Sequence, residues 1–170
     1  EYNLLSNNGQ KNNALLQSFK PTDRDEKISL LKLNIMVAMQ KNNYTEVLTL
    51  VRKINSLYNI SDTSRIDEMD DYMRMTAQFT YYTSARTYAL LKQNAKALYY
   101  VEKALQSGLL YKNLFDNDPS WQGVRNNPSW KKMMKVYAAA TEEFITNALT
   151  APAGYKNPLS YRIPNEANYD

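Results

Sequence analysis

The chain has 170 residues, of which 44% are hydrophobic and 22% charged, and its formal net charge is +4. This length allows one domain with a substantial core, and the scarcity of Gly and of β-branched runs favours helix over sheet. There is no Cys and no His, which excludes disulfides, thiol nucleophiles, the usual zinc sites and imidazole general bases. We therefore expect an all-α protein that is not an enzyme and needs no cofactor or metal.

The first predicted elements are two helices separated by Pro21. A short helix is expected from about Gln10, and a longer one from about residue 23 to residue 41, with Thr22 as its N-cap and acidic residues in its first turn. The apolar positions of the longer helix follow one face of a 3.6-residue period: Ile28, Leu31, Ile35 and Ala38.

The chain continues as two predicted helical hairpins. A polar turn at residues 41–43 leads to a helix over 44–58, and because the turn is short the two helices must pack antiparallel. A long helix over 64–92, a tight turn at Gln93-Asn94 and a helix over 95–106 repeat this arrangement. Gly108 follows as a residue suited to the left-handed conformation after a helix.

The start of the long helix is acidic, with Asp67, Asp70 and Asp71 on one face. Three carboxylates could hold a divalent ion in principle. Acidic residues are common at helix N-termini because the helix dipole favours them. The structural role is the better interpretation, so no metal site is predicted.

The two hairpins resemble tetratricopeptide repeats, whose signature alternates small and large residues through a pair of helices. In the second hairpin the signature falls on Ala85, Tyr88, Ala97, Val101 and Ala104. In the first it falls on Ile35, Ala38, Val47, Val51 and Ile54, without the small residues. Val47 and Ala97 are 50 residues apart, against about 34 in a regular repeat.

The segment after Gly108 resembles the stretch that closes the last repeat in bacterial members of this family. It contains Asp118-Pro119 and Asn127-Pro128, each a cap residue followed by Pro at the first helical position. Trp121 and Trp130 are expected to cover the apolar side of helix 95–106, since a terminal repeat needs a cap. Arg125 is expected to pair with a carboxylate that holds this segment in place.

A final helix is predicted from Pro128 through Phe144 to Leu149, and Ala151-Pro152-Ala153-Gly154 ends it. The resemblance implies a short right-handed superhelix of antiparallel hairpins with about 6–7 helices. Residues 1–150 form the helical repeat domain in this interpretation. Residues 151–170 form an extended tail or linker.

The charge distribution and the hydropathy of the chain argue against a nucleic-acid partner and against a transmembrane segment. The basic residues are spread along the chain, whereas nucleic-acid domains concentrate them on a patch, so no nucleic-acid partner is expected. No apolar run approaches the about 20 residues of a transmembrane helix. The lack of Cys and the many Asn and Tyr suit a bacterial cell-envelope or secreted location. The sequence does not fix the compartment or the oligomeric state.

The resemblance also implies a binding surface, because the first helix of each hairpin lines a groove in this family. The corresponding side chains here are Lys32, Met36, Met39, Phe79, Tyr82 and Arg86. Cations, aromatic rings and flexible Met side chains suit an extended peptide with an acidic or carboxylate end. Under the alternative interpretation, Met36, Met39 and Phe79 are ordinary core residues of a bundle without a groove.

Two functions follow from these observations. The first is a non-catalytic protein-binding or scaffolding module, in which Tyr82 and Arg86 are expected to contact the partner. The second is an accessory helical domain of a longer enzyme whose catalytic part lies outside this chain. The acidic residues share helix faces, whereas paired catalytic carboxylates must converge from different elements.

Overall fold

The computed structural model describes residues 18–60, 69–109 and 113–150, except for the side chains of residues 113, 144, 145 and 147–150. Helices, joined by turns and short irregular segments, are the only regular secondary structure among the described residues. Their bounds are α2 Arg24–Gln40, α3 Tyr44–Tyr58, α4 Asp71–Leu90, α5 Asn94–Gln106, α6 Asn113–Asp116, the 3-10 helix η3 Pro119–Gly123, and α7 Pro128–Thr150. The all-α fold class is therefore confirmed.

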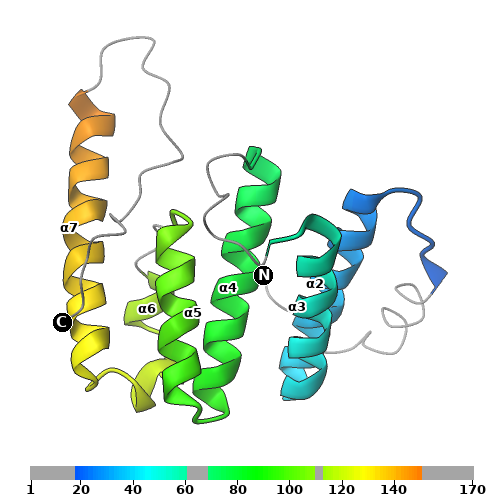
Figure 1. Cartoon of the computed structure of the whole chain (residues 1–170), viewed down its shortest axis with the longest axis horizontal. Helices are drawn as coiled ribbons and strands as arrows, with labels where there is room; N and C mark the ends of the chain where they lie inside the picture. Colours follow the sequence, from blue (N-terminus) through cyan, green and yellow to red (C-terminus); the bar gives the residue numbers. More distant parts are fainter. Residues whose placement is uncertain (1–17, 61–68, 110–112, 151–170) are drawn as a thin grey trace.

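The long helices stand side by side in a row, as Figure 1 shows. Helix α4 packs against α3 on one side and against α5 on the other, and α7 lies against α5. The predicted helix near Gln10 and the predicted tail over 151–170 lie outside the described residues. No helix in the described ranges is long and apolar enough to cross a membrane.

The N-terminus of α2 differs from the prediction. The N-cap is Asp23, whose carboxylate accepts a 2.8 Å hydrogen bond from the backbone N–H of Glu26. The Glu26 carboxylate in turn accepts the backbone N–H of Thr22 at 2.7 Å. Thr22 is therefore the residue before the cap, and the reciprocal pair of bonds satisfies amide groups that a helix start leaves unpaired.

Helix α4 also begins later than predicted. It starts at Asp71, after Asp70, whose carboxylate accepts the backbone N–H of Met73 at 2.7 Å. Residues 69 and 70 are not helical, and Ser64 and Asp67 lie outside the described residues. An Asp side chain that caps a helix competes with continuation of that helix towards the N-terminus, so the acidic stretch marks a boundary.

The two hairpins turn in the same way. In the first, Asn42 has φ 55° and the N–H of Asn43 donates to the Ala38 carbonyl at 2.9 Å. In the second, Lys92 has φ 57° and the N–H of Gln93 donates to the Tyr88 carbonyl at 2.9 Å. Each turn reverses the chain within about one turn of helix and brings two helices together as an antiparallel pair.

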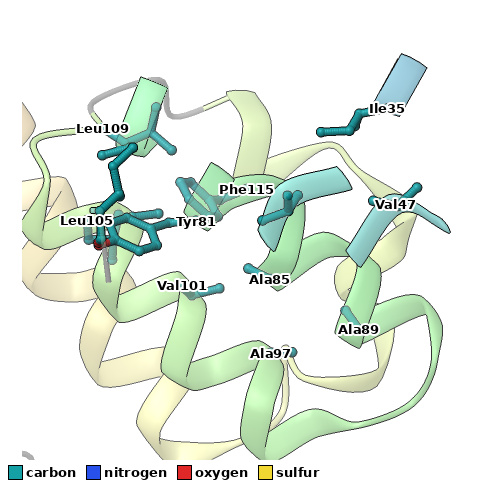
Figure 2. Packing of buried hydrophobic residues seen from close by; sticks show 14 of the residues in the cluster. Ile35, Val47, Tyr81, Ala85, Ala89, Ala97, Val101, Leu105, Leu109 and Phe115 are labelled. Atoms are coloured by element: carbon teal, nitrogen blue, oxygen red, sulfur yellow. The ribbon is translucent and has the colours of Figure 1, made fainter. Parts of the chain in front are cut away.

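Residues at the repeat-signature positions of the two hairpins form part of the buried core. Ile35, Val47, Val51 and Ile54 are buried in the first hairpin, as are Ala85, Ala97, Val101 and Ala104 in the second. Figure 2 shows the small side chains of Ala85, Ala89 and Ala97 where α4 and α5 approach each other. Small residues at these positions let the backbones of α4 and α5 lie close together. Helix α4 also contacts α3 and η3.

The end of α5 depends on one glycine. Gly108 has φ 84°, and the N–H of Leu109 donates to the Ala104 carbonyl at 3.2 Å. An L-residue at this φ is strained. We expect Gly108→Ala to lower the free energy of unfolding by about 1 kcal/mol in chemical denaturation.

Gly123→Ala is the matched control for this substitution. A Cβ at Gly123 would meet only the Asn94 side-chain oxygen at 3.6 Å, an ordinary contact. Its free energy of unfolding should stay at or slightly above that of the wild type. Equal losses in the two variants would contradict a special conformational demand at Gly108.

Candidate functional site

The side chains that the sequence pointed to lie on α2 and along one stripe of α4, which runs through Tyr72, Met75, Phe79, Tyr82 and Arg86 at the spacing of successive helical turns. At Tyr82 and Arg86 the stripe meets the segment between α5 and α7, residues 113–127, which we call the connector, and we call this part of α4 the connector face. At Phe79 the stripe lies beside Lys32 of α2.

On the connector face, Tyr82 and Arg86 have intrachain partners. Arg86 Nε lies 2.6 Å from Asp118 Oδ2, and the Tyr82 hydroxyl donates to the Leu114 carbonyl at 3.2 Å. The same hydroxyl lies 3.4 Å from Asp118 Oδ2. These contacts hold the connector against α4. A role for Tyr82 and Arg86 in partner binding stays a prediction.

The aromatic side chains of the connector form one cluster on this face. The Tyr82 ring meets Phe115 and Trp121 edge-on, with centroid distances of 5.7 and 5.9 Å. Trp121 is fully buried, and its indole N–H donates to the Leu114 carbonyl at 2.8 Å. Trp130 packs on Trp121 at 5.3 Å. Both Trp side chains are buried, in agreement with a structural role. The 3-10 helix η3, which carries Trp121, packs against α4, and α7, which carries Trp130, packs against α5.

Arg125 stabilises the connector differently from the prediction. Its Nη2 donates to the backbone carbonyls of Asp116 at 2.6 Å and of Asp118 at 3.2 Å, and within the described ranges it has no recorded bond to a carboxylate. The short helix α6 ends at Asp116 and leaves carbonyl groups without helical partners. A guanidinium with five donors can satisfy several of these carbonyls at once.

Asp118 is the charged centre of the connector. It caps η3 by accepting the backbone N–H of Ser120 at 2.8 Å, and it also accepts the Ser120 hydroxyl. Burial raises the pKa of the Asp118 carboxyl, but the Ser120 hydrogen bonds and the Arg86 guanidinium outweigh this effect and leave the pKa below its ordinary value. The carboxylate is therefore held in its charged form.

The N-terminal part of the α4 stripe and the neighbouring side chains of α2 form a surface that we call the α2–α4 surface. It consists of Lys32, Leu33, Met36, Tyr72, Met75 and Phe79. Lys32 lies at its centre: its ammonium donates to the Thr76 hydroxyl at 2.9 Å and lies 5.0 Å from the Tyr72 ring centroid and 5.6 Å from that of Phe79. Desolvation lowers the pKa of Lys32, against a smaller opposing effect of Asp25.

The apolar members of the α2–α4 surface are unusually exposed. Leu33 is 46% exposed, Met36 49%, Tyr72 36% and Met75 64%. Met36 is therefore not a core residue, which corrects the alternative interpretation for this side chain. Met39 and Phe79 are partly buried against the core, and the Thr87 hydroxyl lies 3.7 Å from the Met39 sulfur. The α2–α4 surface thus combines exposed Met, Leu and Tyr side chains with the partly buried Phe79.

Leu33, Tyr72 and Met75 were not predicted as part of this surface. Tyr72 and Met75 precede Phe79 on one side of α4, at the spacing of successive helical turns. That signal was in the sequence. The late start of α4 at Asp71 was not, and without it the two residues fall inside the longer helix predicted over 64–92.

The structure gives the acidic residues structural roles. Asp70 caps α4, and Asp67 lies outside the described residues. Among the residues with described positions, no group of three or more carboxylate, His or Cys side chains could hold a metal ion.

Comparison of the chain with protein-family models found no match, and comparisons with curated proteins and with solved structures found no significant match. Inferences about function therefore rest on the residues and contacts described above.

The Arg86–Asp118 pair gives a prediction about stability. Arg86→Met removes the ion pair and leaves a half-buried carboxylate with one cationic partner fewer. We expect the free energy of unfolding to fall by about 1–2 kcal/mol, at the lower end for such pairs because solvent partly screens Arg86. Denaturant unfolding followed by Trp fluorescence measures this directly, because both Trp residues, Trp121 in the connector and Trp130 in α7, are buried in the folded protein.

Arg52→Met is the control for that variant. Arg52 is exposed and donates to the Leu48 carbonyl of its own helix at 3.2 Å. We expect its free energy of unfolding to change by less than about 0.5 kcal/mol. If Arg52→Met lowered the free energy of unfolding as much as Arg86→Met does, the result would contradict a special role for the Arg86–Asp118 pair.

The lowered pKa of Asp118 gives a prediction about acid stability. Because the folded-state pKa lies below the ordinary value of 3.8, the charged Asp118 contributes stability above that pH. This contribution is lost as the pH falls below 3.8 through the folded-state pKa. The difference in free energy of unfolding between wild type and Asp118→Asn should therefore shrink as the pH is lowered from about 5 to about 2.5. A difference that stays constant over this range would contradict the assignment.

Proposed function

We propose that this protein is a non-catalytic protein-binding module of the tetratricopeptide-like class, and that it holds an extended peptide on the α2–α4 surface. The observation that carries the proposal is the exposure of Leu33, Met36, Tyr72 and Met75 around the half-buried Lys32. Single exposed apolar residues need no explanation, but several on two adjacent helices mark an interaction surface.

The residue types support a peptide as the ligand. Met side chains are flexible and polarisable, so Met36 and Met75 can adapt to different apolar side chains of a partner. Tyr72 and Phe79 supply rigid rings beside them, and aromatic residues contribute strongly to binding energy at interfaces. An extended chain that lies between α2 and α4 would contact both helices along their length.

Lys32 supports an acidic group on that peptide. Its ammonium is partly desolvated between two rings, and in the described part of the chain no carboxylate lies within 4.0 Å of it. A cation in such surroundings gains more from a carboxylate than a fully hydrated one does. A side-chain or terminal carboxylate of the partner is the complementary group.

The proposal gives a binding test with a defined probe. The probe is a fluorescein-labelled peptide of sequence Gly-Ser-Leu-Ala-Leu-Asp with a free C-terminal carboxylate, measured by fluorescence anisotropy. We expect Lys32→Met to weaken its binding by about tenfold, which corresponds to about 1.4 kcal/mol. The free energy of unfolding should change little, since removal of a half-buried charge offsets the lost bond to Thr76.

Lys96→Met is the matched control for this test. Lys96 also lies over an aromatic ring, 5.3 Å from the Tyr88 centroid, but on α5 and away from the α2–α4 surface. Its binding should equal that of the wild type. Equal affinity of the wild type and Lys32→Met for the peptide, or failure of the peptide to bind the wild type, would contradict the proposed function.

A further inference from the structure

A pocket opens at one end of the α2–α4 surface, beside the first turns of α2. Its volume is about 590 Å³, within the range of ligand-binding pockets, which runs from roughly 300 to 1,000 Å³. The lining includes Phe19, Asp25, Glu26, Leu30, Leu33 and Tyr72. Leu33 and Tyr72 belong to the α2–α4 surface as well, so the pocket is continuous with that surface.

The walls of the pocket are mostly apolar and partly exposed. Phe19 and Leu33 are among the most exposed large apolar side chains of the described residues. Tyr72 is held in place by its neighbours: its ring meets Tyr58 edge-on at 6.2 Å, and its hydroxyl lies 3.4 Å from the Asp25 carbonyl. A side chain entering here would remove apolar area from water against a preformed wall.

Three carboxylates of the lining, those of Asp23, Asp25 and Glu26, define its charge. Within the described residues, the recorded bonds use one oxygen of each: Asp23 accepts the Glu26 N–H, Glu26 accepts Thr22, and Asp25 accepts the Tyr58 hydroxyl. A carboxylate has a second acceptor oxygen.

The cations near the pocket are not part of its lining. Arg24 lies over the Tyr58 ring at 4.2 Å, towards α3, and its Nε is 3.8 Å from Asp25 Oδ1, the oxygen that the Tyr58 hydroxyl also uses. Lys32 lies beyond the Tyr72 ring, 5.0 Å from its centroid. The pocket therefore combines apolar walls with a negative rim, while the neighbouring part of the α2–α4 surface is positive.

An apolar side chain alone would not suit this pocket, because it would remove from water the second oxygen of carboxylates whose recorded hydrogen bonds use only one oxygen. The side chains of Arg and Lys have an apolar stem and a cationic head, which match the walls and the rim respectively. We propose that the pocket takes an Arg or Lys side chain of the peptide held on the α2–α4 surface. This inference rests on the proposed function and adds that the peptide is dipolar, with its acidic group at Lys32.

The test uses NMR titration of the ¹⁵N-labelled full chain with blocked tripeptides. We expect acetyl-Leu-Arg-Leu-amide to shift the backbone amides of Phe19, Leu30 and Tyr72, and acetyl-Leu-Glu-Leu-amide to leave them unchanged. The double variant Asp25→Asn and Glu26→Gln keeps hydrogen-bond acceptors for Tyr58 and Thr22. It should weaken binding of the Arg peptide by about three- to tenfold. Leu33→Ala, on the exposed apolar wall, should weaken it as well.

Glu46→Gln is the matched control, because Glu46 is an exposed carboxylate in the first turn of α3, where it accepts the Asn43 side-chain N–H at 2.7 Å. It should bind the Arg peptide as the wild type does. Equal shifts of the pocket amides with the Glu peptide would overturn the inference. Shifts of Lys32 and Met36 without any at the pocket would overturn it too, while leaving the proposed function standing.

Discussion

Helix α4 is contacted by other elements on several faces, and the rest of the structure depends on residues small enough to permit this. It packs against α3, α5 and η3, and Lys32 of α2 reaches it through Thr76. Nine of its residues are buried, most of them Ala, Thr or Ser. Ser84 and Thr87 donate to carbonyls one turn earlier, at 2.8 and 2.7 Å. Polar residues can therefore line a crowded helix without unpaired hydroxyl groups.

This arrangement gives two parts of one stripe of α4 different roles. At its C-terminal part, Arg86 and Tyr82 hold the connector, and Trp121 is buried beneath it. At its N-terminal part, Lys32 of α2 contacts Thr76, and Met36 and Met75 remain exposed. Since both parts carry aromatic and cationic side chains, their residue types alone do not distinguish a structural from a binding role.

Local features of the fold were predictable from the sequence, and long-range partners were not. The bounds of α3 and the Pro-initiated turns at Pro119 and Pro128 agree with prediction, because caps, turns and helical periodicity are encoded within a few residues. Asp118 is 32 residues from Arg86, and no local pattern indicates that they meet. The predicted superhelix remains a prediction, as does the relation to tetratricopeptide repeats.

The central claim is that the α2–α4 surface is open while the connector face is sealed. Limited oxidation of the full-length chain with hydrogen peroxide, followed by peptide mass spectrometry, tests it most directly, because Met sulfoxide forms fastest at accessible sulfurs. Met36 is 49% exposed and Met75 64%, whereas Met133 in α7, the helix that follows the connector, is 3% exposed. We predict rapid oxidation of Met36 and Met75 and slow oxidation of Met133. Protection of Met36 and Met75 equal to that of Met133 would show that the surface is covered and would contradict the account.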